Sequence, residues 1–366
     1  MTRARELADL GGSADAGGIT GKNLIINGNA ACSQRATQAT GVTSTGYHAC
    51  DRFKFLYTDA GTWTVSQSTD APDGFANSFK VECTTAKSSL ASNSRLFILH
   101  HLEGQNLQQL KKGTSAAESI TLSFYVRTNK TGTYQVHVED NDNIRIIGST
   151  YTVSTANTWQ KVTVTLAGDT TGSLDNDNGD SFAVFFALVA GTDNSSGAVP
   201  TAWEAKTNAD RGAGLNVNLA DATSNYWQIS GLQMEIGDVA TPFEHESFAE
   251  TLQKCQRYYQ KSFHYVTPPG SATPSNHELQ FSFGTATTLI AGAFVVLPVQ
   301  LRANPTITFY DNAGTSGKVS KFSGGGGRTD NITLNVARGL ENRINVRIYA
   351  SSAAGVGFMY QVDAEL

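Results

Sequence analysis

Short runs of alternating polar and apolar residues recur along most of the chain, and they constrain its fold more than any other feature of the sequence. In the clearest run, residues 119–128, four apolar side chains would share one face of a strand: Ile120, Leu122, Phe124 and Val126. Similar patterns occupy residues 133–140, 158–168, 181–191 and 225–237. Alternation with a period of two residues, interrupted by turns, predicts an all-β fold with an antiparallel sandwich.

Neighbouring segments extend this pattern. Three earlier stretches also look like short strands: NLIINGNA at 23–30, RFKFLYT at 52–58 and TWTVSQST at 62–69. Residues 181–191 are apolar on both faces, which predicts a central strand. The long polar segment 192–224 is expected to be a surface loop or excursion.

The C-terminal part of the chain, residues 266–366, is expected to form a second, smaller β-sandwich domain. About six strand-like stretches fall there: HELQFSFG, AFVVLPVQL, TITFYDNAG, NITLNVAR, RINVRIYAS and FMYQVDAEL. The GGGG at 324–327 predicts a mobile turn between two of them.

One segment breaks the β pattern. Residues 247–261 read SFAETLQKCQRYYQK, in which Ser247 and Glu250 have the spacing of a capping box. Four residues recur at helical spacing and would form one face: Phe248, Leu252, Cys255 and Tyr259. We predict one helix of about four turns that links the two domains, within residues 247–265.

Tyr258 would lie on a stripe beside that face, together with Thr251 and Ser262. Two interpretations of Tyr258 stay open. It packs within its own chain against neighbouring strands, or it forms an oligomer contact, because tyrosine buries a large area at low entropic cost.

The charge distribution argues against some partners. The chain has a net charge of -5 and no basic block, whereas nucleic-acid binding needs clustered Lys and Arg. The densest basic spot, Lys111–Lys112, is expected to be solvated surface. No apolar stretch reaches the roughly 18 residues of a membrane span. The N-terminus lacks the apolar core of a secretion signal, so we expect assembly in a cytoplasm.

The four cysteines are Cys32, Cys50, Cys83 and Cys255, and they form no CxxC pair, which argues against a zinc ribbon. Cys255 is expected to be a buried small hydrophobic residue. Cys32 and Cys50 could be neighbours in space, but the sequence does not establish a disulfide.

The sequence contains no catalytic or cofactor motif that we could identify, so we expect a protein that is not an enzyme and needs no cofactor. GxSxG, HExxH, P-loop and GxGxxG motifs are absent. Glycan cleavage needs two carboxylates, which 139–142 and 174–180 offer only in acidic loops without a fold template. His100, His101 and His137 lack metal-ligand spacing, and His137 is expected to face solvent or the other side of its strand.

The stretch DNDNGD raises the question of calcium. Asp175, Asp177 and Asp180 crowd hard oxygen ligands around a Gly turn, which is the chemistry that Ca²⁺ prefers. The terminal Glu of an EF-hand is missing. We interpret the stretch as an Asx-rich hairpin turn, and a structural Ca²⁺ site stays open as the alternative.

Residues 3–10, RARELADL, can form two helical turns in which Leu7 and Leu10 share a face. A Gly-rich connector follows. A disordered tail and a short docking peptide are the two interpretations of this segment.

Three stretches resemble a known family: KNLIINGNAACSQRAT, GYHACDRFKF and YWQISGLQMEIGDVATPFEHESFAETLQKCQRYYQK. By order and spacing over about residues 22–262 they look like a group of bacteriophage virion proteins described as tail fibres. In that group, motifs of this kind open and close a jelly-roll domain similar to carbohydrate-binding modules.

The resemblance implies a domain order: a virion-attachment segment at 1–22, a jelly roll at 23–246, the linking helix, and a distal receptor-contacting domain at 266–366. Leu7 and Leu10 would dock on other virion tail proteins. The resemblance also implies a homotrimer in the phage tail that contacts a host-surface glycan or protein receptor. A glycan-binding module without a fibre role and a polysaccharide depolymerase are the alternatives.

The resemblance also gives meaning to polar positions in these motifs. Arg35 or Arg52 would pair with Asp51 as a structural clamp. Pro242 and Phe243 would fix the exit of the chain from the sandwich, with Phe243 plugging the edge of the core. No ligand-binding residues are implied.

Overall fold

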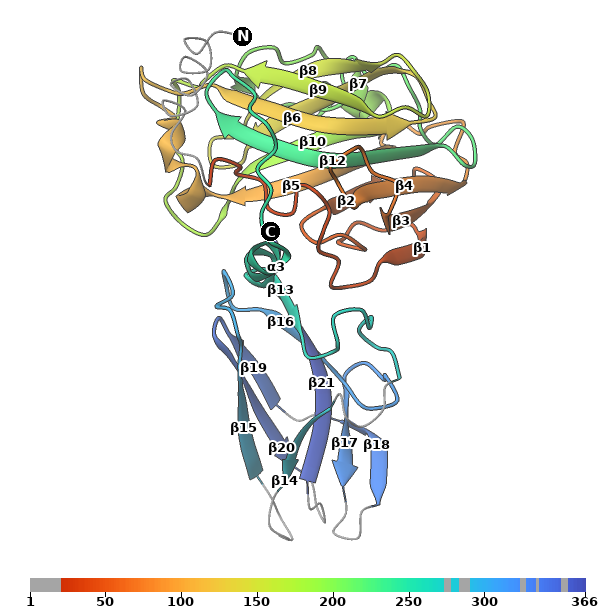
Figure 1. Ribbon diagram of the computed structural model, residues 1–366, viewed down its shortest axis with the longest axis vertical. Helices are drawn as coiled ribbons and strands as arrows, with labels where there is room; N and C mark the ends of the chain where they lie inside the picture. Colours follow the sequence, from red (N-terminus) through yellow and green to blue (C-terminus); the bar gives the residue numbers. More distant parts are fainter. Residues whose placement is uncertain (1–20, 273–277, 283–289, 323–326, 334–335, 350–354) are drawn as a thin grey trace. The chain divides into compact units, whose positions relative to one another are not determined.

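The computed structural model describes residues 21–272, 278–282, 290–322, 327–333, 336–349 and 355–366 (Figure 1). The chain divides into two compact units. The first contains the described residues through Ser33, Thr37–Phe248 and Leu366; the second contains Gln34–Ala36 and Ala249–Glu365. Leu7, Leu10 and most of the GGGG turn lie outside the described residues.

The first unit consists of two six-stranded sheets. Sheet A has the spatial order β1 (Gln38–Val42), β3 (Thr62–Ser68), β4 (Ser78–Thr85), β12 (Tyr226–Ile236), β6 (Ile120–Thr128) and β9 (Gln160–Leu166). Sheet B has the order β11 (Glu204–Ala205), β8 (Arg145–Val153), β7 (Gly132–Asp140), β10 (Asp180–Ala190), β5 (Arg95–Glu103) and β2 (Lys54–Thr58). The chain crosses repeatedly between the sheets, as in a jelly roll, and the strand pairs are antiparallel. This confirms the predicted all-β sandwich.

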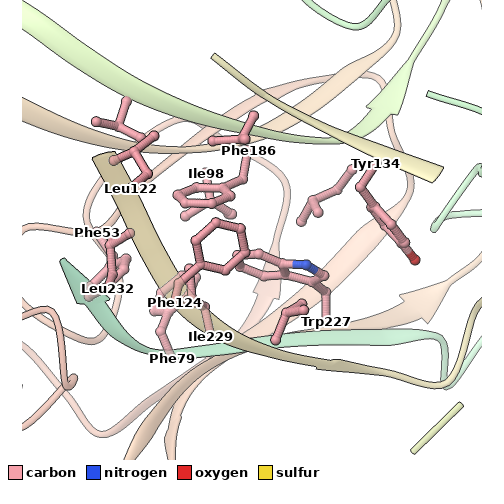
Figure 2. Close-up of a cluster of buried hydrophobic side chains, with 14 of the residues drawn as sticks. Phe53, Phe79, Ile98, Leu122, Phe124, Tyr134, Phe186, Trp227, Ile229 and Leu232 are labelled. Atoms are coloured by element: carbon pink, nitrogen blue, oxygen red, sulfur yellow. The ribbon is translucent and has the colours of Figure 1, made fainter. Parts of the chain in front are cut away.

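The inward faces of both sheets meet in one core, part of which Figure 2 shows. It is built around large side chains that are no more than 1% exposed, among them Trp63, Phe79, Phe124, Phe186 and Trp227. Burial of each such side chain contributes on the order of 1.5–3 kcal/mol. The core therefore follows from the alternation in the sequence, since these residues occupy inward positions of their strands.

Strand β10 is central, as predicted, with β5 on one side and β7 on the other. Its residues on one face, Phe182, Val184 and Phe186, join the main core. Ala183, Phe185 and Ala187 belong to a second apolar cluster on the outer face of sheet B.

Other predictions for this unit need correction. NLIINGNA contains no strand, because positive φ angles at Asn27 (63°) and Ala30 (53°) form turns there. Strands β1, β4, β5 and β8 were not predicted. The segment 192–224 contains α2 (Thr192–Ser195), β11 and the 3₁₀ turn η3 (Asn208–Asp210); η1 (Gly104–Asn106) and η2 (Gln108–Leu110) follow β5.

The second unit is a smaller sandwich. One sheet has the order β13 (Tyr259–Lys261), β21 (Gly355–Asp363), β17 (Lys318–Phe322) and β18 (Arg328–Thr333), and β14 (Leu279–Ser282) and β16 (Thr306–Tyr310) also pair with β21. The other sheet has the order β15 (Ile290–Val296), β20 (Arg343–Tyr349) and β19 (Val336–Leu340). Residues of both sheets, such as Phe358 and Ile344, share one core. Strand β17 was not predicted.

The predicted helix is shorter than expected. Helix α3 spans Phe248–Gln256, and the N–H of Tyr258 bonds to the carbonyl of Cys255 (3.0 Å) in a tight turn. Tyr259 then begins β13, which pairs with β21. The aromatic pair favours a strand once a partner edge is present. No helix among the described residues is long and apolar enough to span a membrane.

The buried side of α3 is also different from the prediction. Cys255 is buried as expected, but Phe248 is 50% exposed, and Thr251 is buried instead. Tyr258 is 1% exposed in the single chain. Of the two interpretations of Tyr258, this burial favours packing within its own chain, and Ser262 on the same stripe is half-buried. The trimer itself stays a prediction.

Candidate functional site

A pocket of about 300 Å³ lies on the outer face of sheet A, the face that points away from the core. Strand β6 places Ser123 and Tyr125 in this pocket because they alternate with the core residues Leu122 and Phe124. The full lining is Asp73, Gly74, Phe75, Ser123, Tyr125, Lys161, Gly231, Pro242, Phe243 and His245.

Aromatic rings dominate the pocket. The Phe75 ring lies between three others, with its centroid 5.6 Å from that of Tyr125 and 5.1 Å from those of Phe243 and His245. Phe243 and His245 are 5.0 Å apart. Phe75, Tyr125 and Phe243 are only partly buried, so part of each ring faces solvent.

A β-bulge in β12 makes room for this cluster. The register of β12 against β6 shifts between Ser230 and Gln233, and Gly231 within the bulge has φ +62°. A Cβ atom at Gly231 would lie 2.7 Å from Cζ of Phe75 and 3.2 Å from Cδ2 of Tyr125. Only glycine therefore combines this backbone conformation with the close approach of both rings.

The segment that carries Phe243 and His245 is held by hydrogen bonds of the residue between them. Glu244 accepts a hydrogen bond at Oε2 from the N–H of Asn23 (2.9 Å), and its own N–H donates to Oε1 of Gln233 (2.8 Å). The carboxylate of Glu244 is thus bonded to the start of the unit. Phe243 was expected to plug the edge of the core, but it lies on the outer face of sheet A and lines the pocket.

Two charged side chains line the pocket. Lys161 faces Tyr125 across β9 and β6, with Nζ 5.9 Å from the ring centroid, and Asp73 is exposed. Neither forms an ion pair within the part of the chain that the structure describes. By contrast, Asp70 nearby accepts hydrogen bonds from Arg127 (2.5 and 2.6 Å) and Trp159 (3.3 Å).

This arrangement can hold a small ligand that has both an apolar face and polar groups. Partly exposed rings offer contact area at low entropic cost. Asp73, Ser123 and Lys161 can exchange hydrogen bonds with hydroxyl or anionic groups. Ligand sites commonly combine apolar walls with a few placed polar groups in this way.

A second cluster of charges lies on the outer face of sheet B, and it is buried. Glu139, whose side chain is 2% exposed, accepts hydrogen bonds from Arg211 Nε (2.5 Å), Lys206 Nζ (3.2 Å) and His137 Nε2 (3.3 Å). Burial alone would raise the pKa of Glu139, but the hydrogen bond from His137 and the charges of Arg211 and Lys206 lower it to about 2. Glu139 therefore holds the segment 192–224 against the sheet.

His137 was expected to face solvent or the other side of its strand, and only the second alternative is correct. It lies on the opposite side of β7 from Val136 and Val138, but it is fully buried, and its ring stacks on Phe185 (4.6 Å). Burial is the main cause that lowers the pKa of His137.

Lys112 was expected to be solvated, and the structure shows otherwise. Its side chain is 3% exposed, and Nζ lies 2.6 Å from Asp140 and 3.2 Å from Asp169. The carbonyls of Thr171 and Gly172 accept further hydrogen bonds from it. The sequence around Lys112 could not predict this burial, because the partners of Lys112 lie in strands and loops that are distant along the chain.

The stretch with the alternative calcium site forms hydrogen bonds within the protein, through the carboxylates of Asp177 and Asp180 and the backbone N–H of Asp175. Asp177 Oδ1 accepts from the N–H of Gly179 (2.7 Å), as in an Asx turn, and Asp180 Oδ2 accepts from His101 Nδ1 (2.8 Å). The N–H of Asp175 donates to Asp142 (3.0 Å). No group of three or more His, Cys, Asp or Glu side chains among the described residues could hold a metal ion.

The polar residues of the opening motif have a structural role in the second unit. Arg35 pairs with Asp363 (2.8 Å) and Glu365 (3.4 Å), and its guanidinium carbon lies 3.8 Å from the centroid of the Tyr259 ring. Gln34 Nε2 donates to the carbonyl of Tyr259 (3.1 Å). Arg35 thus ties strands β13 and β21 together through Asp363 and Tyr259, whereas the predicted clamp was a pair with Asp51.

The pocket residues were not identified from the sequence. A signal was present for Tyr125, which occupies an outward position in the best-defined alternating strand. No comparable signal marks Phe75, Lys161 or His245, which come from a turn, an edge strand and an irregular segment.

Comparisons with known proteins give little further information. No protein-family model matches the chain, and no curated protein matches it. Among solved structures, the chain is similar to the enzymatically active domain of tailspike protein 4 of bacteriophage CBA120, with 10% identity and a TM-score of 0.31 over 59% of this chain and 21% of that chain.

Two smaller proteins are also similar. One is a putative sugar binding protein from Bacteroides thetaiotaomicron, with 13% identity and a TM-score of 0.31 over 58% of this chain and 99% of that chain. The other is a family 11 carbohydrate-binding module from Clostridium thermocellum, with 9% identity and a TM-score of 0.28 over 56% and 99%. At such values these similarities carry no argument about the present chain, which spans about a fifth of the tailspike domain.

Proposed function

We propose that the chain is a structural subunit of a bacteriophage tail fibre that binds a host-surface glycan without cleaving it. The open aromatic pocket on sheet A is the observation that carries the glycan part of this proposal. A pyranose ring has apolar faces and a rim of hydroxyl groups. The rings of Phe75, Tyr125 and Phe243 match the faces, and Asp73, Ser123 and Lys161 match the rim.

The fibre part of the proposal is supported by the motifs at the two ends of the first unit. The closing motif supplies Phe243 and His245 to the pocket, and the opening motif supplies the Arg35 clamp. We further propose that residues 1–22 attach to other tail proteins through Leu7 and Leu10, that three copies assemble, and that residues 266–366 form the distal part of the fibre.

Cleavage is not expected at this pocket, because its lining has a single carboxylate. Glycosidases commonly use two carboxylates on opposite sides of the scissile bond, and the pocket lining contains only Asp73. Glu139 is occupied by Arg211 and Lys206 on the other sheet. Incubation with the bound polysaccharide should therefore release no shorter sugars, and chain shortening by the purified protein would instead support a depolymerase.

The binding test uses Tyr125→Ala, which removes one wall of the pocket. We expect its affinity for host surface polysaccharide to fall by at least about tenfold, measured by biolayer interferometry on immobilised polysaccharide. Phe294→Ala is the matched control, because Phe294 is an aromatic residue that is 67% exposed in the second unit. Equal binding by wild type and Tyr125→Ala, with Phe294→Ala weakened, would move the site to the second unit.

A further inference from the structure

We infer that the pocket selects acidic glycans and that Lys161 is the residue that determines this selectivity. The inference rests on the proposed function and adds the substrate class: a sugar that carries a carboxylate, such as a uronic acid. The observation behind the inference is that the ammonium group of Lys161 is unpaired among the described residues, whereas three neighbouring charged side chains have partners.

Apart from Asp73, three other charged side chains of this region, Arg127, Glu244 and Lys80, are bonded within the protein. Arg127 is bound to Asp70, so it is not available to an anionic ligand. Glu244 accepts hydrogen bonds from the N–H groups of Gly21 and Asn23, and it is not among the residues that line the pocket. Lys80, on the same outer face, pairs with Glu82.

Lys161 is different. It is exposed and lines the pocket, and its ammonium group makes no hydrogen bond or ion pair with any described residue. Strand pairing places it directly beside Tyr125, so a sugar ring that stacks on Tyr125 would bring its substituents within reach of the ammonium group. A charge-assisted hydrogen bond to a carboxylate is stronger than one to a hydroxyl group.

Asp73 provides a negative charge in the same pocket, at a position separate from the positive charge of Lys161. It lines the same pocket and lies more than 4.0 Å from Lys161, since the two form no salt bridge. An acidic sugar satisfies both residues, because its hydroxyl groups can donate to Asp73 while its carboxylate accepts from Lys161. A fully anionic ligand such as a polyphosphate would be repelled by Asp73.

The experiment compares one glycan in two forms. The strongest binder in an array of bacterial surface polysaccharides is tested before and after chemical reduction of its carboxylates to primary alcohols. We expect wild type to bind the acidic form about tenfold more tightly. Lys161→Met should bind the acidic and the reduced forms with equal affinity, whereas Lys161→Arg should retain the preference.

The control is Lys87→Met, which changes an exposed lysine outside the pocket that pairs with Asp59; it should behave as wild type. The inference alone would be overturned if the strongest binder is neutral, or if the preference persists in Lys161→Met, while Tyr125→Ala still weakens binding. If no glycan on the array binds, or if Tyr125→Ala binds normally, the proposed function fails and this inference fails with it.

Discussion

Glu139 lies on the outer face of sheet B, and three side chains donate hydrogen bonds to it. A buried carboxylate of this kind is stable only because its charge is compensated. The same holds for its partner Arg211, whose guanidinium also lies 4.8 Å from the centroid of the Phe185 ring. Each of these charges therefore depends on the other, which makes the cluster sensitive to single substitutions.

Glu139→Gln should lower the free energy of unfolding of the first unit by about 2–4 kcal/mol, because it leaves Arg211 and Lys206 without their anion. Urea unfolding followed by the fluorescence of the buried Trp63 and Trp227 measures this change. The control is Glu82→Gln, which breaks a pair whose Glu side chain is 36% exposed and should change the stability by less than about 1 kcal/mol. Equal losses in the two variants would contradict a special role for Glu139.

The lowered pKa of Glu139 predicts that the stability of the first unit depends on pH. The pKa of Glu139 is about 2 in the folded chain against an ordinary 4.5, so its stabilisation is present above pH 4.5 and is lost as the pH falls toward 2. The loss amounts to about 3 kcal/mol. Unfolding of wild type and Glu139→Gln from pH 7 to pH 2 measures it.

The variant should lose less stability than wild type below pH 4.5. Burial lowers the pKa of both His100 and His137, and the unfolded chain takes up protons that these residues do not accept when folded. Both proteins should therefore become less stable below about pH 6.5. Parallel curves for the two proteins below pH 4.5 would assign the acid sensitivity to other groups.

At the scale of elements, the bulge in β12 gives a test of how the sheet shapes the pocket. Gly231→Ala should destabilise the first unit by about 1–3 kcal/mol, from the strained backbone and from the contact with Phe75, and it should weaken glycan binding. Gly41→Ala is the matched control, because Gly41 has a similar φ of +67° but no atom within 4 Å of the added Cβ. Identical effects on binding would show that the bulge does not position Phe75.

The strands were predictable where one face is buried, because β6, β7, β9, β10 and β12 read as alternating or continuous apolar runs. The failures have specific causes. NLIINGNA is apolar enough for a strand, but positive φ angles at Asn27 and Ala30 turn the chain. The helix was predicted to be too long because Tyr259 fits the apolar spacing of a helix. Tyr259 forms a strand instead because it pairs with the edge of β21, which lies far away in the sequence.

At the scale of the whole molecule, the core was more predictable than the site. Core positions follow from local alternation, whereas the pocket is assembled from five separate parts of the chain, around Phe75, Tyr125, Lys161, Gly231 and Phe243. Only the tertiary arrangement brings these together. The clamp at Arg35 has the same origin, since its partners Asp363 and Glu365 lie more than 300 residues away in the sequence.

The proposed division of labour along the chain leads to a last prediction. If residues 1–22 serve only to attach the protein to the virion, attachment and glycan binding should be separable. Deletion of residues 2–18 should leave a folded protein with the affinity of wild type for polysaccharide, because the pocket lies within residues 73–245. The same deletion should remove the protein from assembled virions, measured by immunoblotting of purified particles.

A double substitution sharpens this test, since a deletion also shortens the chain. Leu7→Asp with Leu10→Asp keeps the length and removes the apolar pair that a two-turn helix would need for docking, because so short a helix is not stable alone in water. It should reproduce the loss from virions, whereas Tyr125→Ala should be incorporated normally and adsorb poorly to cells. Normal incorporation of the deleted protein would refute attachment through this segment and would leave the pocket proposal standing.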